Sequence, residues 1–190
     1  MDVVAGTDTS TPADFERLLA GIRQLTALAD GAADADAMFR ALARELLAVP
    51  GAEEVHIHHL ALDSHSSEEL VAVYLAGGIG RLSYLQPHGE RPPGVSWVAS
   101  TRNNFLATDS EALETSIPRL AETGAVSGAL LLPLADRGEV QAVVVLVRRE
   151  AQPFTAAEVE LAAALVEQAP PRSRSPALVP RPAPTRSPAA

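Results

Sequence analysis

The hydrophobic pattern is clearest near the C-terminal end of the chain, where it predicts two paired strands followed by a helix. A short apolar run at 129–134 and a longer one at 140–147 are separated by turn residues at 136–138. The longer run is β-branched and lacks the apolar–polar alternation of a strand with one wet face. We therefore expect it to be a central strand covered on both faces. Thr155 and Glu158 have the spacing of a capping box, which predicts a helix beginning after Thr155.

The charged residues at 148–150 follow the long apolar run directly. Because charged side chains are rarely buried, we expect them to mark the exit of this strand into solvent.

Helical periodicity dominates the N-terminal part of the chain. The segment 11–14 (TPAD) is a typical helix start, with a capping threonine, a proline at the first helical position and an acid at the third. Apolar residues then recur at heptad spacing, at Phe15, Leu18, Ile22, Leu25 and Ala29. Two heptads are too short for an independent coiled coil, so this helix should pack on its own domain, on a second copy, or on both. A second helix is predicted over 36–49 and ends before Pro50 and Gly51.

Period-two alternation predicts a strand at 54–62. Two further strands are predicted at 70–76 and 81–86, so that the three form an antiparallel meander. The glycines at 77–80 precede strand-like residues rather than a helix, so we interpret them as a hairpin turn and not as a phosphate loop. The segment 87–127 is less regular. It contains a predicted short helix at 94–99, a short strand at 104–108, and a helical stretch at 111–122 that is broken by Pro118.

Composition sets the domain limits and the compartment. Residues 1–10 and the proline-, arginine- and serine-rich residues 170–190 cannot bury a core, so we expect a disordered N-terminus, one domain over 11–169, and a disordered tail or linker. The first residues lack the basic flank and apolar core of a signal peptide, and no apolar run is long enough to span a bilayer. We therefore expect a cytoplasmic protein without a membrane partner. High alanine and arginine content without lysine suggests a bacterial coding sequence.

Charge and residue usage narrow the chemistry further. The net charge is −9, although the tail carries four arginines and no acid, so the body is strongly acidic and should not bind nucleic acid through phosphates. The chain has no cysteine and no lysine. Thiolate metal sites, thiol nucleophiles, Schiff-base chemistry and a P-loop lysine are therefore excluded.

Histidines are the remaining candidates for metal binding or catalysis. His56 and His58 share one face of the predicted strand at 54–62, and His65 lies in the following loop with Asp63 and Ser64. With so few ligands nearby we expect no metal or other cofactor, and we interpret His56 and His58 as polar residues on the outer face of a solvated or edge strand. Asp63, Ser64 and His65 are adjacent loop residues and cannot form a catalytic triad by themselves. With no cysteine, no lysine and no credible acid–base pair, we do not expect an enzyme.

Aromatic residues in the middle third are candidates for a binding pocket, namely Tyr74, Tyr84, Trp97 and Phe105. Small-molecule pockets combine aromatic walls with a few polar groups. Ordinary core packing explains the same residues equally well, so both interpretations stay open.

The order of these elements, over roughly 15–169, resembles a GAF domain. The matching segments are 93–99 (PGVSWVA), 104–109 (NFLATD), 131–134 (LLPL), 138–146 (GEVQAVVVL) and 153–155 (PFT). The resemblance implies an α+β fold, with a GAF/PAS-like antiparallel sheet, N- and C-terminal helices packed on one face, and short helices and loops over the other.

The resemblance also implies a non-catalytic sensory or regulatory domain of bacterial signal transduction. A small molecule would bind between the sheet and the loops of 87–127, and the terminal helices would relay binding to a homodimer partner or to an output domain after the tail. The residues expected at the ligand are Tyr74, Tyr84, Trp97, Phe105, Asp109 and Ser127. Phe105 and Asp109 match half of a motif in cyclic-nucleotide-binding members, but its lysine and glutamate are missing. The alternative is a dimerisation or scaffold module with a degenerate pocket and no ligand.

Overall fold

A computed structural model describes residues 16, 19–23, 35–48, 50–60, 68–77, 81–122, 124–136, 138–149 and 152–169. The strands are β1 (Glu54–His59), β2 (Glu68–Leu75), β3 (Arg81–Pro87), β4 (Phe105–Ala107), β5 (Gly128–Asp136) and β6 (Glu139–Arg148). The helices are α2 (Ala35–Ala48), the short 3-10 helix η1 (His88–Glu90), α3 (Pro93–Thr101), α4 (Ser110–Ser116), α5 (Pro118–Glu122) and α6 (Ala156–Glu167). The predicted disordered ends, the loop with His65, and the glycines at 78–80 lie outside the described residues.

All six strands form one antiparallel sheet with the order β3-β2-β1-β6-β5-β4. The meander β1-β2-β3 forms one half of the sheet, and the other half is built around the β5–β6 hairpin. Antiparallel pairing of β1 with β6 joins the halves, with Glu54 opposite Val147 and His58 opposite Val143. The prediction that 140–147 is central is confirmed, because β6 lies between β1 and β5 and is buried from Ala142 onward.

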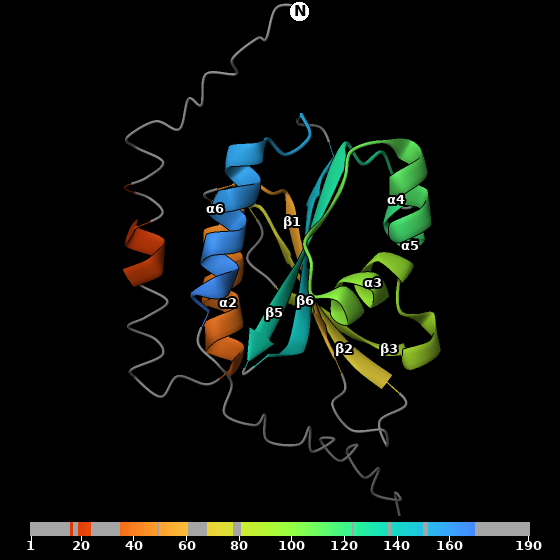
Figure 1. Cartoon of the computed structure of the whole chain (residues 1–190), viewed down its shortest axis with the longest axis horizontal. Helices are drawn as coiled ribbons and strands as arrows, with labels where there is room; N and C mark the ends of the chain where they lie inside the picture. The colour runs from red at the N-terminus through yellow and green to blue at the C-terminus, as the bar shows by residue number, and fades with distance from the viewer. Residues whose placement is uncertain are drawn as a thin grey trace, which may run out of the picture.

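Helices cover both faces of the sheet (Figure 1). α2 and α6 pack on one face, which we call the α2/α6 face, over an apolar core that includes Val55, Ile57 and Leu146. α3, α4 and α5 lie over the opposite face, which we call the α3–α5 face, above a second core that includes Val143 and Val145. The α+β architecture expected from the sequence is therefore confirmed.

The N-terminal helix is described at residues 16 and 19–23, and there it packs on the α2/α6 layer. A Cβ atom added to Gly21 would lie 2.8 Å from Glu45 Oε2 and 3.3 Å from Leu165 Cδ2, so the helix backbone approaches both α2 and α6 closely. Ile22 packs against the same core. One position of the heptad pattern therefore faces the chain's own domain; the predicted start at Thr11 and the other heptad residues lie outside the described residues.

Local signals set the ends of several helices. Thr155 Oγ1 accepts a hydrogen bond from the Glu158 amide at 3.3 Å, and Glu158 Oε2 accepts one from the Thr155 amide at 2.8 Å. The predicted capping box at the start of α6 is thereby confirmed. Pro118 is the first residue of α5. Proline is tolerated there because a backbone N–H at the first helical position makes no hydrogen bond within the helix. Among the described helices none combines the length and apolar character needed to cross a bilayer.

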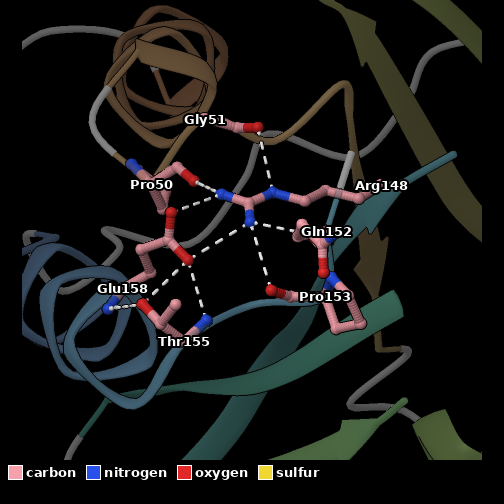
Figure 2. A network of polar contacts seen from close by, with 7 residues as sticks. All are labelled: Pro50, Gly51, Arg148, Gln152, Pro153, Thr155 and Glu158. Atoms are coloured by element: carbon pink, nitrogen blue, oxygen red, sulfur yellow. Dashed lines mark hydrogen bonds and ion pairs between the residues drawn. The ribbon is translucent and has the colours of Figure 1, made fainter. Parts of the chain in front are cut away.

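Arg148 ties the α2/α6 layer to the end of the sheet, and Figure 2 shows its contacts. The expectation that this residue marks an exit into solvent is wrong, since it is only 6% exposed. Its guanidinium donates to carbonyls on both sides of it, those of Pro50, Gly51 at 3.2 Å, Gln152 at 3.0 Å and Pro153 at 3.5 Å. It also binds both carboxylate oxygens of Glu158, at 2.7 and 3.2 Å, and lies 4.3 Å from the centre of the Phe154 ring.

The bidentate pairing explains how a charged residue is tolerated here. A buried guanidinium is stable only when a counter-charge and enough acceptors surround it. Burial alone would raise the pKa of Glu158, but the hydrogen bonds from Arg148 and Thr155 outweigh it and lower that pKa. Arg148 thus holds the N-terminus of α6 against the connection between α2 and β1.

Gly94, the glycine of the segment PGVSWVA, is expected to be intolerant of a side chain. A Cβ atom there would lie 2.8 Å from Ser116 Cβ and 3.0 Å from both Ser116 O and Leu131 Cδ2. We predict that Gly94→Ala lowers the free energy of unfolding by about 1–3 kcal/mol, because overpacking outweighs the gain in helix propensity of about 1 kcal/mol. Urea denaturation measures this change.

Gly89→Ala is the matched control, because no atom lies within 4 Å of its added Cβ. It should stay within about 0.5 kcal/mol of the wild type. Equal stability of the two variants would show that α3 does not pack this closely on α4 and β5.

Candidate functional site

A row of polar side chains crosses the centre of the α3–α5 face. Glu54, His56 and His58 occupy alternate positions of β1 and therefore share this face. The valines of β6 and β2 flank them, with His56 between Val145 and Val73 in the strand register. The two histidines are buried, His56 being 6% and His58 4% exposed, and Glu54 is partly buried.

The interpretation of His56 and His58 as residues on a solvated or edge strand is therefore wrong. Alternation in EVHIHH indicates a strand with one apolar and one polar face, and that part is correct. However, β1 is hydrogen-bonded to β2 on one side and to β6 on the other. β1 is therefore not an edge strand, and the burial of both imidazoles shows that this face is covered and not solvated.

Glu54 organises one end of the row. His56 Nε2 lies 2.8 Å from Glu54 Oε2, and Arg149 Nε donates to Glu54 Oε1. The hydrogen bond from His56 is the largest influence, and together with the bond from Arg149 it overcomes desolvation and lowers the pKa of Glu54 to about 2. Because an ionised carboxylate only accepts, Nε2 of His56 must carry a proton.

His58 occupies the middle of the face as a neutral imidazole. Burial is the main cause, and the nearby His56, Arg91 and His59 add to it, so that the pKa of His58 falls to about 3. At neutral pH this ring has one donor and one acceptor nitrogen and no charge. It suits hydrogen bonding to a polar ligand atom better than pairing with an anion.

A second polar pair lies toward β3. Arg91 donates from Nε to Glu69 Oε2 at 2.9 Å and from its terminal nitrogen to Glu69 Oε1, and Glu69 is buried. The neighbouring Gln86, opposite Glu69 in the strand register, is also buried and donates to the carbonyl of Glu90. Sequence reasoning missed this pair. The observed β2 begins at Glu68, two residues before the predicted strand 70–76, so Glu69 lies in the strand and not in the preceding loop.

The aromatic residues expected at the ligand do not form one cluster. Trp97 and Phe105 contact each other edge to face, with ring centroids 5.6 Å apart. Tyr84 shares the α3–α5 face but lies on the edge strand β3, whereas Phe105 lies on the opposite edge strand β4. Burial raises the pKa of Tyr84, while the charge of Arg119 opposes this shift. Tyr84 and Trp97 remain 45% and 43% exposed.

Tyr74 lies on the wrong face for such a site. It is opposite Val55 in the strand register and belongs to the core beneath α2 and α6. Alternation along β2 makes this unavoidable, because Val71 and Val73 occupy the α3–α5 face and Tyr74 is one residue further on.

The two polar residues of the expected site have local structural roles. Asp109 is exposed and caps α4, its Oδ1 accepting from the Ala112 amide at 2.8 Å. Ser127 donates from its backbone and its hydroxyl to the carbonyl of Arg148, at 2.8 and 3.2 Å. Within the described residues, no group of three His, Asp or Glu side chains is placed to hold a metal ion.

A family model described as GAF domain matches residues 32–169. A comparison with curated protein sequences gives no match.

Solved structures of GAF domains resemble this one. The GAF domain of a phosphoenolpyruvate-protein phosphotransferase from Coxiella burnetii is 18% identical with a TM-score of 0.59, over 81% of this chain and 90% of that one. The GAF-B domain of DevS from Mycobacterium smegmatis is 22% identical with a TM-score of 0.52, over 72% and 90%. The phycocyanobilin-bound GAF domain of a cyanobacterial phytochrome is 16% identical with a TM-score of 0.61, over 80% and 91%.

The buried neutral His58 makes stability depend on pH. The unfolded chain binds a proton at this residue below about pH 6.5, whereas the folded chain does so only near pH 3. More protons are bound in the unfolded state within this window, so the free energy of unfolding must fall as pH falls, with a limiting slope of about 1.4 kcal/mol per pH unit from this group.

We predict that His58→Gln flattens the pH dependence of urea unfolding between pH 7 and pH 5. Glu54 does not interfere there, because its stabilisation is lost only as pH falls from 4.5 toward 2. Comparing slopes, not absolute stabilities, removes the effect of the substitution on packing. An unchanged slope in the variant would mean that His58 is not held neutral by the fold.

Proposed function

Because the chain belongs to the GAF domain family, we propose that it is a non-catalytic sensory module that binds a small molecule against the α3–α5 face. Binding would be reported through the helices of the α2/α6 layer. The observation that carries this proposal is the pair of buried imidazoles, His56 and His58, on a central strand of that face.

The two faces of the sheet differ in a way that core packing alone does not require. On β1 the α2/α6 face carries Val55 and Ile57, which are fully buried among apolar residues. The other face of the same strand carries Glu54, His56 and His58. Burying polar groups costs free energy unless they are hydrogen-bonded, and replacing them by apolar residues is often neutral or stabilising. A few polar groups set among valines are what a small-molecule site uses to fix orientation.

The family context is consistent with this proposal. GAF domains serve as sensory and regulatory domains, and one of the structurally similar domains is phycocyanobilin-bound. A domain of this fold can therefore hold a small molecule. The identity of the ligand for this chain has to come from experiment, because the similarity to the solved structures is a similarity of fold.

The test is a thermal-shift screen of nucleotides, amino acids, sugars, organic acids and tetrapyrroles. A compound present at about 100 times its dissociation constant should stabilise the fold by about 2.7 kcal/mol and raise Tm. Trp97 is the chain's single tryptophan and is half-exposed, so its fluorescence provides a second readout. Failure of every class to change either signal would count against ligand sensing.

Variants then locate the site for any compound that binds. His58→Gln should weaken binding at least about tenfold, the loss expected when one buried hydrogen-bond partner is misplaced. Ser83→Ala is the control, because Ser83 is exposed and alternates with Tyr84 onto the opposite face of β3. Equal losses in the two variants would contradict binding at the α3–α5 face.

A dimerisation or scaffold module is the second candidate, and the N-terminal helix favours it. The helical residues 19–23 lie on α2 and α6, so helices from both ends of the domain share one side of the molecule. Such a layer can pair with a second copy in the manner of a helical bundle. We predict a homodimer by light scattering at micromolar concentration, and a monomer would contradict this candidate without affecting ligand binding.

A further inference from the structure

We propose that the adjacent residues Arg148 and Arg149 couple the two faces of the sheet. They would transmit a change in the polar row of the α3–α5 face to the N-terminus of α6. This inference rests on the proposed function, for which it names the residues that carry the relay. Both are positioning residues, because they act through other side chains and need not touch a ligand.

The geometry follows from alternation at the end of β6. Val147 is opposite Glu54 in the register and faces the α3–α5 layer, so Arg148, the last residue of β6, faces the α2/α6 layer. Arg149 follows the strand, and its hydrogen bond to Glu54 places its side chain on the α3–α5 side. Two guanidinium groups on consecutive residues are thus held on opposite faces, with one short piece of backbone between them.

On the α3–α5 side, Arg149 is the end of a continuous chain of polar contacts. Its Nε donates to Glu54 Oε1, and Glu54 Oε2 lies 2.8 Å from His56 Nε2. The segment between α5 and β5 also reaches this point, since a Cβ atom on Gly124 would be 3.5 Å from Arg149 Nη1. A change at Glu54 therefore acts directly on Arg149, and a change at His56 acts on Arg149 through Glu54.

On the α2/α6 side, Arg148 contacts the ends of two helices (Figure 2). Pro50 and Gly51, whose carbonyls accept from it, follow α2, while Glu158 lies in the first turn of α6. The guanidinium is buried, so water cannot replace a contact that is lost. Any displacement of the strand end at 148–149 must rearrange these bonds or break them, and both outcomes alter how α6 is held.

A double-mutant cycle tests this coupling without any ligand. Glu54→Gln weakens the contact with Arg149, and Glu158→Gln weakens the contact with Arg148; the two carboxylates share no partner. Independent sites change the unfolding equilibrium constant multiplicatively. We expect the double variant to differ from the product of the single effects by at least about fivefold, measured by urea denaturation at neutral pH.

The control cycle combines Glu158→Gln with Glu90→Gln. Glu90 forms an exposed ion pair with Arg119 near the opposite part of the α3–α5 layer and makes no described contact with Arg149. This pair should combine within about twofold. Equal behaviour of the two cycles, whether both multiplicative or both not, would overturn the proposed coupling.

Hydrogen exchange supplies a readout that purely local damage would not change. Glu54→Gln should speed exchange of the amides of Glu158 and Val159 at the start of α6 by about tenfold, while amides near Leu165 keep their wild-type rates. If Glu54→Gln does not fold, Arg149→Lys serves instead, because lysine keeps the charge but loses the guanidinium geometry. Unchanged exchange at Glu158 and Val159 in the folded variant would overturn the proposal.

These results are separable from those of the ligand screen. If the Glu54 and Glu158 effects on the unfolding equilibrium constant are multiplicative, the relay is rejected. If a ligand also binds in a manner that depends on His58, the binding site on the α3–α5 face is retained. If the two effects are not multiplicative but no compound of any class in the screen binds, the coupling is retained and the sensory proposal is rejected.

Discussion

The pairing of β1 with β6 is the constraint on which the rest of this structure depends. β5 and β6 meet through a tight turn, whereas β1 must come from a point far earlier in the chain to add to β6. Once it does, β1 and β6 are both central, and each has two faces that must be covered. The α2/α6 layer and the α3–α5 layer are the consequence, because an uncovered strand of this apolarity would be an aggregation hazard.

Central placement has different effects on the two strands. β6 is suited to it, since residues 142–147 are apolar on both faces. β1 is not, because all the residues that it places on the α3–α5 face, namely Glu54, His56 and His58, are polar. The protein accommodates this by pairing Glu54 with His56 and Arg149, and by keeping His58 uncharged. Buried polar residues limit the ways in which the α3–α5 layer can pack on this face. They are also groups through which a ligand could act on the sheet.

Much of this architecture could be predicted from the sequence because its signals are local. The continuous apolar run at 140–147, the capping box of Thr155 and Glu158, and the glycine and proline positions each report on a few neighbouring residues. The order of the elements predicted from these signals, together with the family motifs, then indicated the fold. Asp109 shows the limit of motif reasoning, because its carboxylate caps α4 and has no described contact with the aromatic residues grouped with it.

The site was harder to predict because it depends on which strands become neighbours. Alternation correctly placed His56 and His58 on one face, but the pairing of β1 with both β2 and β6, and the burial of the two imidazoles, depend on tertiary structure. Tyr74 and Tyr84 look equivalent in sequence, yet they point to opposite faces because the hairpin register places Tyr84 opposite Val71. Glu69 and Arg91 are 22 residues apart, and no local pattern indicates that they will pair.

Arg148 and Arg149 show why the end of a strand can carry more information than its centre. A charged pair after an apolar run normally indicates that the chain has reached water, and here that inference fails for Arg148. Within the strand, neighbouring side chains on opposite faces are insulated from each other by the core around them. At the strand's end both are long and polar, and both reach groups on other elements: the α2–β1 connection and α6 on one side, and β1 on the other. A domain with helices on both faces of one sheet can thus connect those faces through a single peptide unit at the end of a central strand.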